Sequence, residues 1–408
     1  MNTSCGVGIW LAALVLGLAL LLGPQSARAC GGFFGEVNAT STVVAMSDIR
    51  VLLVRQRGLG DLGNTPDRLH QYVQIAYQGD AGRFAWVYPV SANPEVTEAT
   101  SSPFAALEES TAPRITIHSV SSGSGGGGSG CGCLGGDDDG SALRGGGDEA
   151  VPPTVKVWQS GQVGAFDYVV LSATASQTLV DWLHNNGFAV PTSATPVLDH
   201  YLSMAWLFVA MKVSVQKVTG QVPSTTVVRL SHPIAADAPI TYPLRMVSLS
   251  PDKELTLEIF VASAGGVTPR APFATVQVPA TKLKALSART HNYDTVFGET
   301  ARSGPRVLVL EYASSSIDGA IARVPDRVPG NPVLSRFRAV LTPSAMDQDL
   351  LFDRGGTESF MPSYRLEFGG SPDARPAGLP GPLAGLALVW LAWRTLRRRR
   401  DHSPGHRS

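Results

Sequence analysis

The chain has 408 residues, enough for one large domain or two, and its 33 basic side chains balance its 33 acidic ones. Six basic residues lie close to the C-terminus (Arg394, Arg397, Arg398, Arg399, Arg400 and Arg407), so the rest of the chain is mildly acidic. Because a nucleic-acid partner requires a basic face on the folded body, this composition argues against nucleic-acid binding.

The N-terminus has the pattern of a secretory signal peptide. Residues 9–22 are an apolar run that is short for a membrane span but typical of a signal peptide. Small residues, Ala27 and Ala29, occupy the positions that signal peptidase reads. We therefore predict that residues 1–29 are removed by cleavage after Ala29, which leaves Cys30 as the mature N-terminus. The absence of Lys and Arg from the first eight residues departs from the usual pattern, and a buried or anchoring helix is the alternative.

Three cysteines remain after that cleavage: Cys30, Cys131 and Cys133. In an oxidising compartment we expect a disulfide between Cys30 and one of the other two, or a strained bridge between Cys131 and Cys133. A metal site is disfavoured because it needs about four ligands and a C-x-C pair supplies two. Lipid attachment at Cys30 is the other possibility, but Ala27 and Arg28 fit that motif poorly.

Residues 30–120 are predicted to form the β-rich first part of an extracytoplasmic domain. Residues 42–58, 69–79 and 83–90 combine β-branched and apolar residues with alternation, as strands do. In the last of these, Trp86 and Tyr88 fall on one face together with Phe84. We interpret this aromatic row as core packing, with a ligand-stacking platform as the alternative.

Residues 121–149 interrupt the domain with 13 glycines in 29 residues, together with Ser and Asp. Such a composition cannot bury apolar surface, so we predict a flexible linker.

Residues 150–368 are predicted to form an α+β second part. A strand at 166–173 is followed by a helix at 176–187, with Ser176 as its cap and Gly187 at its stop. A second helix is expected at 195–204. Further strands are expected at 205–215, 226–231, 242–249, 254–262, 274–278 and 306–312. The predicted fold class is therefore α+β, with a mostly antiparallel sheet and a few helices.

The C-terminal region has the pattern of a membrane anchor. Residues 369–382, rich in Gly and Pro, are predicted to be a stalk, and residues 383–396 a membrane span. Residues 397–408 would form a basic cytoplasmic tail, because arginines mark the cytoplasmic side. The alternatives are an amphipathic tail and a sorting signal that is later removed.

Sequence motifs for cofactor binding, metal binding or catalysis are weak in this chain. The "GLGDLG" at 58–63 precedes a predicted strand, whereas a dinucleotide site needs a helix there. Carboxylates at 137–140 and at 347–353 (Asp347, Asp349 and Asp353) fit solvated surface charge better than a calcium or acid–base site. The knot "THNYDTVFGE" at 290–299 contains His291, Asn292, Tyr293 and Asp294 and is interpreted as a turn. The histidines His70, His118, His184, His200 and His232 are scattered, and no serine-hydrolase or H-E-x-x-H motif occurs.

The chain resembles a bacterial family, domain of unknown function 2330, over nearly all of residues 29–350. The stretches that carry the resemblance occur in the expected order: "ACGGFF" (29–34), "YQGDAGRFAWVYPV" (77–90), "VGAFDYVVLSATASQTLVDWLHNNGFAVP" (163–191), "MAWLFVAMKV" (204–213), "PITYPLRMVSLSP" (239–251), "YDTVFGETA" (293–301) and "VLVLEYA" (307–313). The resemblance implies an exported, often membrane-anchored protein with no assigned activity. Relatives commonly read "CGGFFC", with a second cysteine where this chain has Gly35, so a cysteine of the mid-chain Gly-rich region has one partner fewer here.

Two functions follow as expectations. The first, which we favour, is a binding or structural module of the cell envelope, outside the cytoplasm (periplasm or cell surface) and held by one membrane span, with an unidentified envelope or protein partner. The second is an extracytoplasmic, hydrolase-like enzyme that uses residues near His291 or the Asp347–Asp353 group. No catalytic residue, cofactor or metal ligand is predicted.

Overall fold

The computed structural model describes residues 32–36, 48–58, 65–76, 85–99, 102–119, 154–191, 194–213, 225–249, 254–316, 319–356 and 358–368. The predicted signal peptide, the cysteines Cys30, Cys131 and Cys133, the Gly-rich linker, the stalk, the span and the basic tail lie outside these ranges. Among the described residues, none of the helices is both long and apolar enough to cross a membrane.

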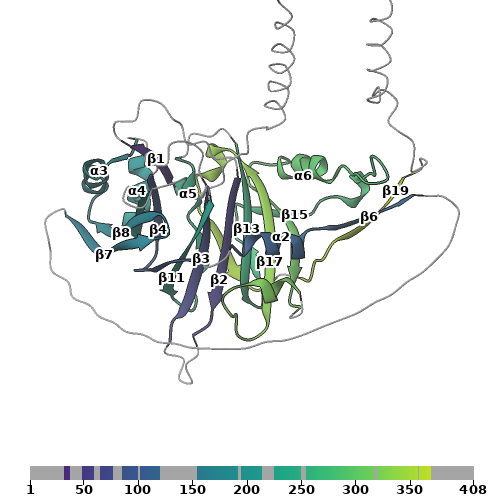
Figure 1. The fold of residues 1–408 in the computed structure, drawn as a ribbon, viewed down its shortest axis with the longest axis horizontal. Coiled ribbons are helices and arrows are strands. Elements are labelled where there is room, and N and C mark those ends of the chain that lie inside the picture. Colours follow the sequence, from purple (N-terminus) through teal and green to yellow (C-terminus); the bar gives the residue numbers. More distant parts are fainter. Residues whose placement is uncertain are drawn as a thin grey trace, which may run out of the picture.

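Two large sheets form the centre of the molecule (Figure 1). The eight-stranded sheet runs in the order β15 (Ala274–Val276), β16 (Val307–Ser314), β17 (Pro332–Leu341), β13 (Leu255–Ala264), β2 (Asp48–Gln56), β3 (Asp67–Ala76), β11 (Thr225–Ile234) and β5 (Glu95–Glu98). The six-stranded sheet runs in the order β7 (Val155–Val163), β8 (Phe166–Ala173), β10 (Leu207–Val213), β4 (Ala85–Val90), β1 (Gly32–Glu36) and β9 (Phe188–Ala189).

Two small sheets complete the fold. One contains β12 (Ile240–Tyr242), β18 (Leu350–Arg354) and β14 (Val267–Pro269), and the other pairs β19 (Ser363–Phe368) with β6 (Arg114–Ser119). Among the described strands, only the pairs β2–β13, β15–β16 and β6–β19 are parallel. The prediction of an α+β fold with mostly antiparallel sheet is therefore confirmed.

The main core lies between the two large sheets. Side chains of β2 and β13, such as Leu53 and Ile259, share one buried cluster with Trp86 and Tyr88 of β4. The rings of Trp86 and Tyr88 stack with centroids 5.1 Å apart, and both side chains are fully buried. This confirms core packing for these two members of the aromatic row, whereas Phe84 lies outside the described residues.

Helices cover the outer faces of both sheets. Helices α3 (Ser176–Asn185) and α4 (Thr195–Ser203) cover the six-stranded sheet. Helix α2 (Phe104–Thr111) covers β2, β3 and β13, and α6 (Tyr293–Ala301) covers β16 and β17. The remaining helical turns are α5 (Leu244–Val247), η4 (Ala280–Lys282), η5 (Ala320–Arg323) and η6 (Pro343–Met346).

Three local predictions are corrected by the structure. The expected strand at 242–249 is the end of β12 followed by the helical turn α5, because a short apolar run does not distinguish strand from helix. The expected turn around Asn292 leads directly into α6, in which buried Tyr293, Val296 and Phe297 have helical spacing. Ser176 is not the cap of α3, since Ala175 occupies that position and makes no side-chain capping bond.

Candidate functional site

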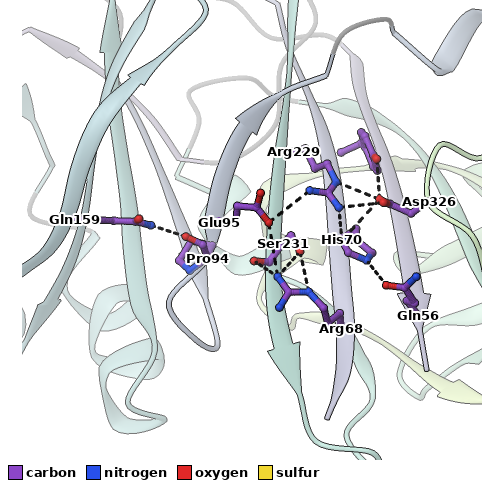
Figure 2. Close-up of polar contacts among 10 residues, drawn as sticks. Gln56, Arg68, His70, Pro94, Glu95, Gln159, Arg229, Ser231 and Asp326 are labelled. Atoms are coloured by element: carbon purple, nitrogen blue, oxygen red, sulfur yellow. Dashed lines mark hydrogen bonds and ion pairs between the residues drawn. The ribbon is translucent and has the colours of Figure 1, made fainter. Parts of the chain in front are cut away.

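A cluster of polar side chains lies on the outer face of the eight-stranded sheet, near its β5 edge (Figure 2). Because side chains alternate along a strand, β3 sends Leu69 and Val73 into the main core. The alternate residues Arg68, His70 and Tyr72 face the other way and meet side chains of β11 and of the loop that contains Asp326.

Asp326 organises the inner half of this cluster. Its carboxylate accepts bonds from Arg229 Nε at 3.1 Å and Nη2 at 2.9 Å, and from the Tyr72 hydroxyl at 2.7 Å. Burial alone would raise the pKa of Asp326, but the hydrogen bonds from Arg229 and Tyr72 and the charges around it lower that pKa below its ordinary value. Burial, with the Asp326 carboxylate beside it, raises the pKa of Tyr72, so its hydroxyl stays a donor.

His70 lies beneath this ion pair as a neutral imidazole. Arg229 Nη2 donates to His70 Nδ1 at 2.9 Å, so the proton lies on Nε2, which donates to Gln56 Oε1 at 3.3 Å. Its side chain is 3% exposed, and burial lowers its pKa to about 4. His70 therefore accepts a hydrogen bond that fixes the guanidinium of Arg229. Its imidazole carries no charge near neutral pH.

The outer half of the cluster is open to solvent. Arg68 donates through Nε at 3.3 Å and Nη2 at 2.8 Å to the Ser231 hydroxyl. Glu95, at the start of β5, is 59% exposed and lies 3.8 Å from both Arg68 Nη2 and Arg229 Nη1. Figure 2 shows these side chains side by side, with Glu95 next to both arginines. Such an arrangement of arginines on a rigid sheet can bind an anion.

A buried ion pair lies at the same end of β3 but on its opposite face. Arg55 Nε donates to Asp67 at 2.7 Å, and its other nitrogens donate to the carbonyls of Ala235, Ala236 and Ala238. Arg354 also binds Asp67. Through these bonds Arg55 connects β2 to β3 and to the segment that follows β11. We therefore assign Arg55 a structural role.

The carboxylates of residues 347–353 are not brought together. Asp347 pairs with Arg306, and Asp353 pairs with Arg270 at the surface. Asp349 is buried and accepts the Tyr201 hydroxyl at 2.7 Å, with His200 Nε2 at 3.4 Å from its other oxygen. The prediction of solvated surface charge is therefore wrong for Asp349, which approaches a histidine of α4.

The polar side chains of residues 290–299 make bonds that fix the neighbouring backbone. Asn292 Oδ1 accepts from the backbone N–H of Lys284 at 2.7 Å, and its amide donates to the Lys282 carbonyl at 3.0 Å. The hydroxyl of Tyr293 donates to buried Glu311 at 2.9 Å. His291 Nδ1 lies 3.4 Å from the backbone nitrogen of Tyr293, and Asp294 lies in the first turn of α6. These bonds fix the entry to α6.

The other described histidines lie on different elements and do not form one cluster. His232 is 1% exposed and accepts from Gln71 Nε2 at 3.0 Å, while Gln71 accepts the Tyr88 hydroxyl at 2.7 Å. His184 Nε2 donates to the Val190 carbonyl at 2.9 Å, and His118 lies on β6.

Within the described ranges, no group of three or more His, Cys, Asp and Glu side chains could hold a metal ion. The carboxylates at 137–140 and the glycine loop beyond Gly58 lie outside those ranges.

Sequence reasoning did not single out Arg68, Arg229, Glu95 or Asp326. The available signal was the alternation of polar and apolar residues along β3, where Arg68, His70 and Tyr72 share one face. Finding their partners requires the pairing of β3 with β11, in which His70 lies opposite Ser231 and Tyr72 opposite Arg229. That pairing joins segments about 160 positions apart.

Comparisons with known proteins place the chain in a family. No match was found among curated proteins or among solved structures. One family model, described as an uncharacterized protein conserved in bacteria, matches residues 26–297, which is more than half of the chain. The prediction from the quoted motifs is thereby confirmed: the chain belongs to the bacterial family DUF2330.

Proposed function

We propose that this protein is a binding module of the bacterial cell envelope. In this proposal residues 1–29 direct export, residues 383–396 span the membrane, and residues 397–408 stay in the cytoplasm. The support is the sequence pattern at the two ends, since a signal-peptide run precedes the body and an apolar run followed by arginines ends it.

The observation that favours binding is the open half of the cluster on the outer sheet face. Arg68 and Glu95 are 43% and 59% exposed, yet both belong to paired strands of the eight-stranded sheet. A rigid scaffold that presents charged side chains loses little conformational entropy when a partner binds. This arrangement suits recognition of a polar or charged partner.

Reporter fusions test the location. Alkaline phosphatase fused after Phe368 should be active in cells, because it folds only outside the cytoplasm, and fused after Ser408 it should be inactive. A fluorescent protein that needs the cytoplasm should give the reverse pattern. Activity of the phosphatase in neither fusion would refute export of the body.

An enzyme remains the second candidate function, and the contact of His200 with Asp349 favours it. A carboxylate that orients an imidazole is half of an acid–base arrangement. Asp349 is held by Tyr201 and by the backbone N–H of Arg245 at 3.0 Å, and the His200 side chain is 30% exposed. Esterase and amidase substrates offered to the full chain and to His200→Ala test this candidate. Turnover that disappears in His200→Ala would favour an enzyme over a binding module.

A further inference from the structure

Two arginines on the outer sheet face are fixed on one side and open on the other. Arg229 uses Nε and Nη2 to bind Asp326 and His70, which leaves Nη1 directed toward Glu95. Arg68 uses Nε and Nη2 to bind Ser231, which is 1% exposed and therefore well fixed. Both guanidinium groups are thus oriented before any ligand arrives.

Glu95 lies between these two groups without a close bond to either. A charge-assisted bond from a guanidinium to a carboxylate is about 2.7–2.9 Å long. Oxygen Oε2 of Glu95 lies 3.8 Å from Arg68 Nη2 and 3.8 Å from Arg229 Nη1, almost 1 Å farther than such a bond. An exposed pair of this kind contributes little to stability, so the carboxylate is easily displaced.

The backbone of Glu95 is nevertheless well placed. Glu95 pairs with Ser231 across β5 and β11, and the preceding Pro94 carbonyl accepts a bond from Gln159 of β7. Figure 2 shows this second contact reaching the segment before β5 from the neighbouring sheet. The glutamate therefore keeps a carboxylate close to both arginines, while its side chain can turn outward to solvent.

We propose that Arg68 and Arg229 form an oxyanion-binding site in which the Glu95 carboxylate stands in for a carboxylate or phosphate group of the ligand. The outer N–H groups of the two arginines bind the oxygens of the incoming anion, and Glu95 moves into solvent. This inference rests on the proposed binding function and specifies the chemistry of its ligand. Arginine suits this role because its planar guanidinium offers two parallel donors to such oxygens.

The charges of the cluster favour a ligand with one or two negative charges. Two arginines face two carboxylates, Asp326 and Glu95, while His70 is neutral because burial lowers its pKa to about 4. When Glu95 leaves, the positive charge of Arg68 is no longer balanced at the site. Asp326 remains bound to Arg229 and keeps it in place.

The test measures the binding of acetate and of inorganic phosphate to the full chain by calorimetry at neutral pH. Glu95→Gln removes the competing carboxylate and is expected to tighten binding about tenfold. Arg68→Gln in the Glu95→Gln background should lose that gain, because each charge-assisted bond is worth about 1.5–3 kcal/mol, or tenfold or more in affinity. Arg68→Lys should recover only part of it, since the planar fork is lost.

Glu254→Gln is the matched control. Glu254 is an exposed glutamate paired with Arg302 at 2.8 Å, so its substitution changes the net charge equally at a distant place. Tighter binding to phosphate alone would assign a phosphate ligand, and tighter binding to acetate a carboxylate ligand. Equal affinities for Glu95→Gln and Glu254→Gln, or an affinity unaffected by Arg68→Gln, would overturn the proposal. Because the purified chain is used, this result is independent of the reporter fusions, which test location.

Discussion

At the scale of single residues, two histidines are buried in the neutral form on opposite faces of one sheet. His70 is 3% exposed and His232 is 1% exposed, and burial lowers the pKa of each to about 4. The charges nearest His70 are those of Asp326, which raises its pKa, and of Arg229 and Arg68, which lower it. In the unfolded chain both imidazoles have a pKa of about 6.5.

We therefore predict that stability falls as the pH falls from 6.5 to 4. In that window the unfolded state binds more protons than the folded state, so the free energy of unfolding decreases toward acid. Each histidine contributes up to about 3 kcal/mol to this loss. Chemical denaturation at pH 7 and at pH 4.5 measures it. His70→Gln should make the dependence shallower, and an unchanged slope would show that His70 is not a buried neutral group.

Arg55 is predicted to be among the residues whose loss destabilises the fold most. Arg55→Ala leaves three backbone carbonyls without their guanidinium partner and removes the buried partner of Asp67, which keeps only the more exposed Arg354 as an arginine partner among the described residues. Breaking one side of a buried ion pair costs about 3–5 kcal/mol. Arg302→Ala removes an exposed pair with Glu254 and should cost no more than about 1 kcal/mol. Similar urea midpoints for the two variants would contradict a structural role for Arg55.

At the scale of elements, the sequence is most informative where a periodic apolar pattern meets a strong stop signal. Helix α3 begins at Ser176 as predicted and ends at Asn185, just before Gly187, which has φ +89°. Leu179, Val180 and Leu183, which have helical spacing in the sequence, are buried. Helix α6 was missed because the Asn and Asp at its start suggested a turn, although such residues commonly precede helices.

The end of α3 gives a prediction with an internal control. Gly187→Ala should lower stability by about 1 kcal/mol, because an L-residue is strained at positive φ and no atom lies near the added methyl group. Gly298 lies inside α6, and the atom nearest to a new methyl group there is the end of the flexible Arg302 side chain. Gly298→Ala should therefore leave stability unchanged or raise it by up to about 1 kcal/mol. Thermal unfolding of both variants checks the contrast, which fails if Gly187→Ala is the more stable.

The packing of α3 on the six-stranded sheet is tested by one core position. Leu183→Ala should cost about 2–5 kcal/mol, because it leaves a cavity among buried side chains. Asp181→Ala on the exposed face of the same helix should change stability by less than about 0.5 kcal/mol. A small effect of Leu183→Ala in urea denaturation would show that α3 is not firmly docked.

At the scale of the whole molecule, the sheets combine strands from both sides of residues 121–149. β2 and β13 pair in parallel although they are about 200 positions apart, and β11 lies between β3 and β5. Alternation along a strand predicts which residues share a face, but it does not predict which strand lies beside which. For that reason the fold class followed from the sequence and the order of strands did not.

The candidate site depends on the same long-range pairing. Gln56, His70, Glu95, Arg229 and Asp326 come from four strands and one loop, and each of them alone has the appearance of an ordinary polar residue. The polar groups that stand out in the sequence are instead the short segments 290–299 and 347–353. Their side chains mainly make bonds that keep the neighbouring backbone in place. Asp349 is the exception, and its partner His200 is again distant in sequence.

Protease treatment of intact cells tests the central claim, an exported body held by a C-terminal span, most directly. With a tag on residue 408 and an antibody to the body, the account predicts that protease added from outside removes the body (after the outer membrane is opened, where one exists). The tagged basic tail should stay protected with the membrane fraction. A body that becomes sensitive only when the cytoplasmic membrane is broken would contradict the account.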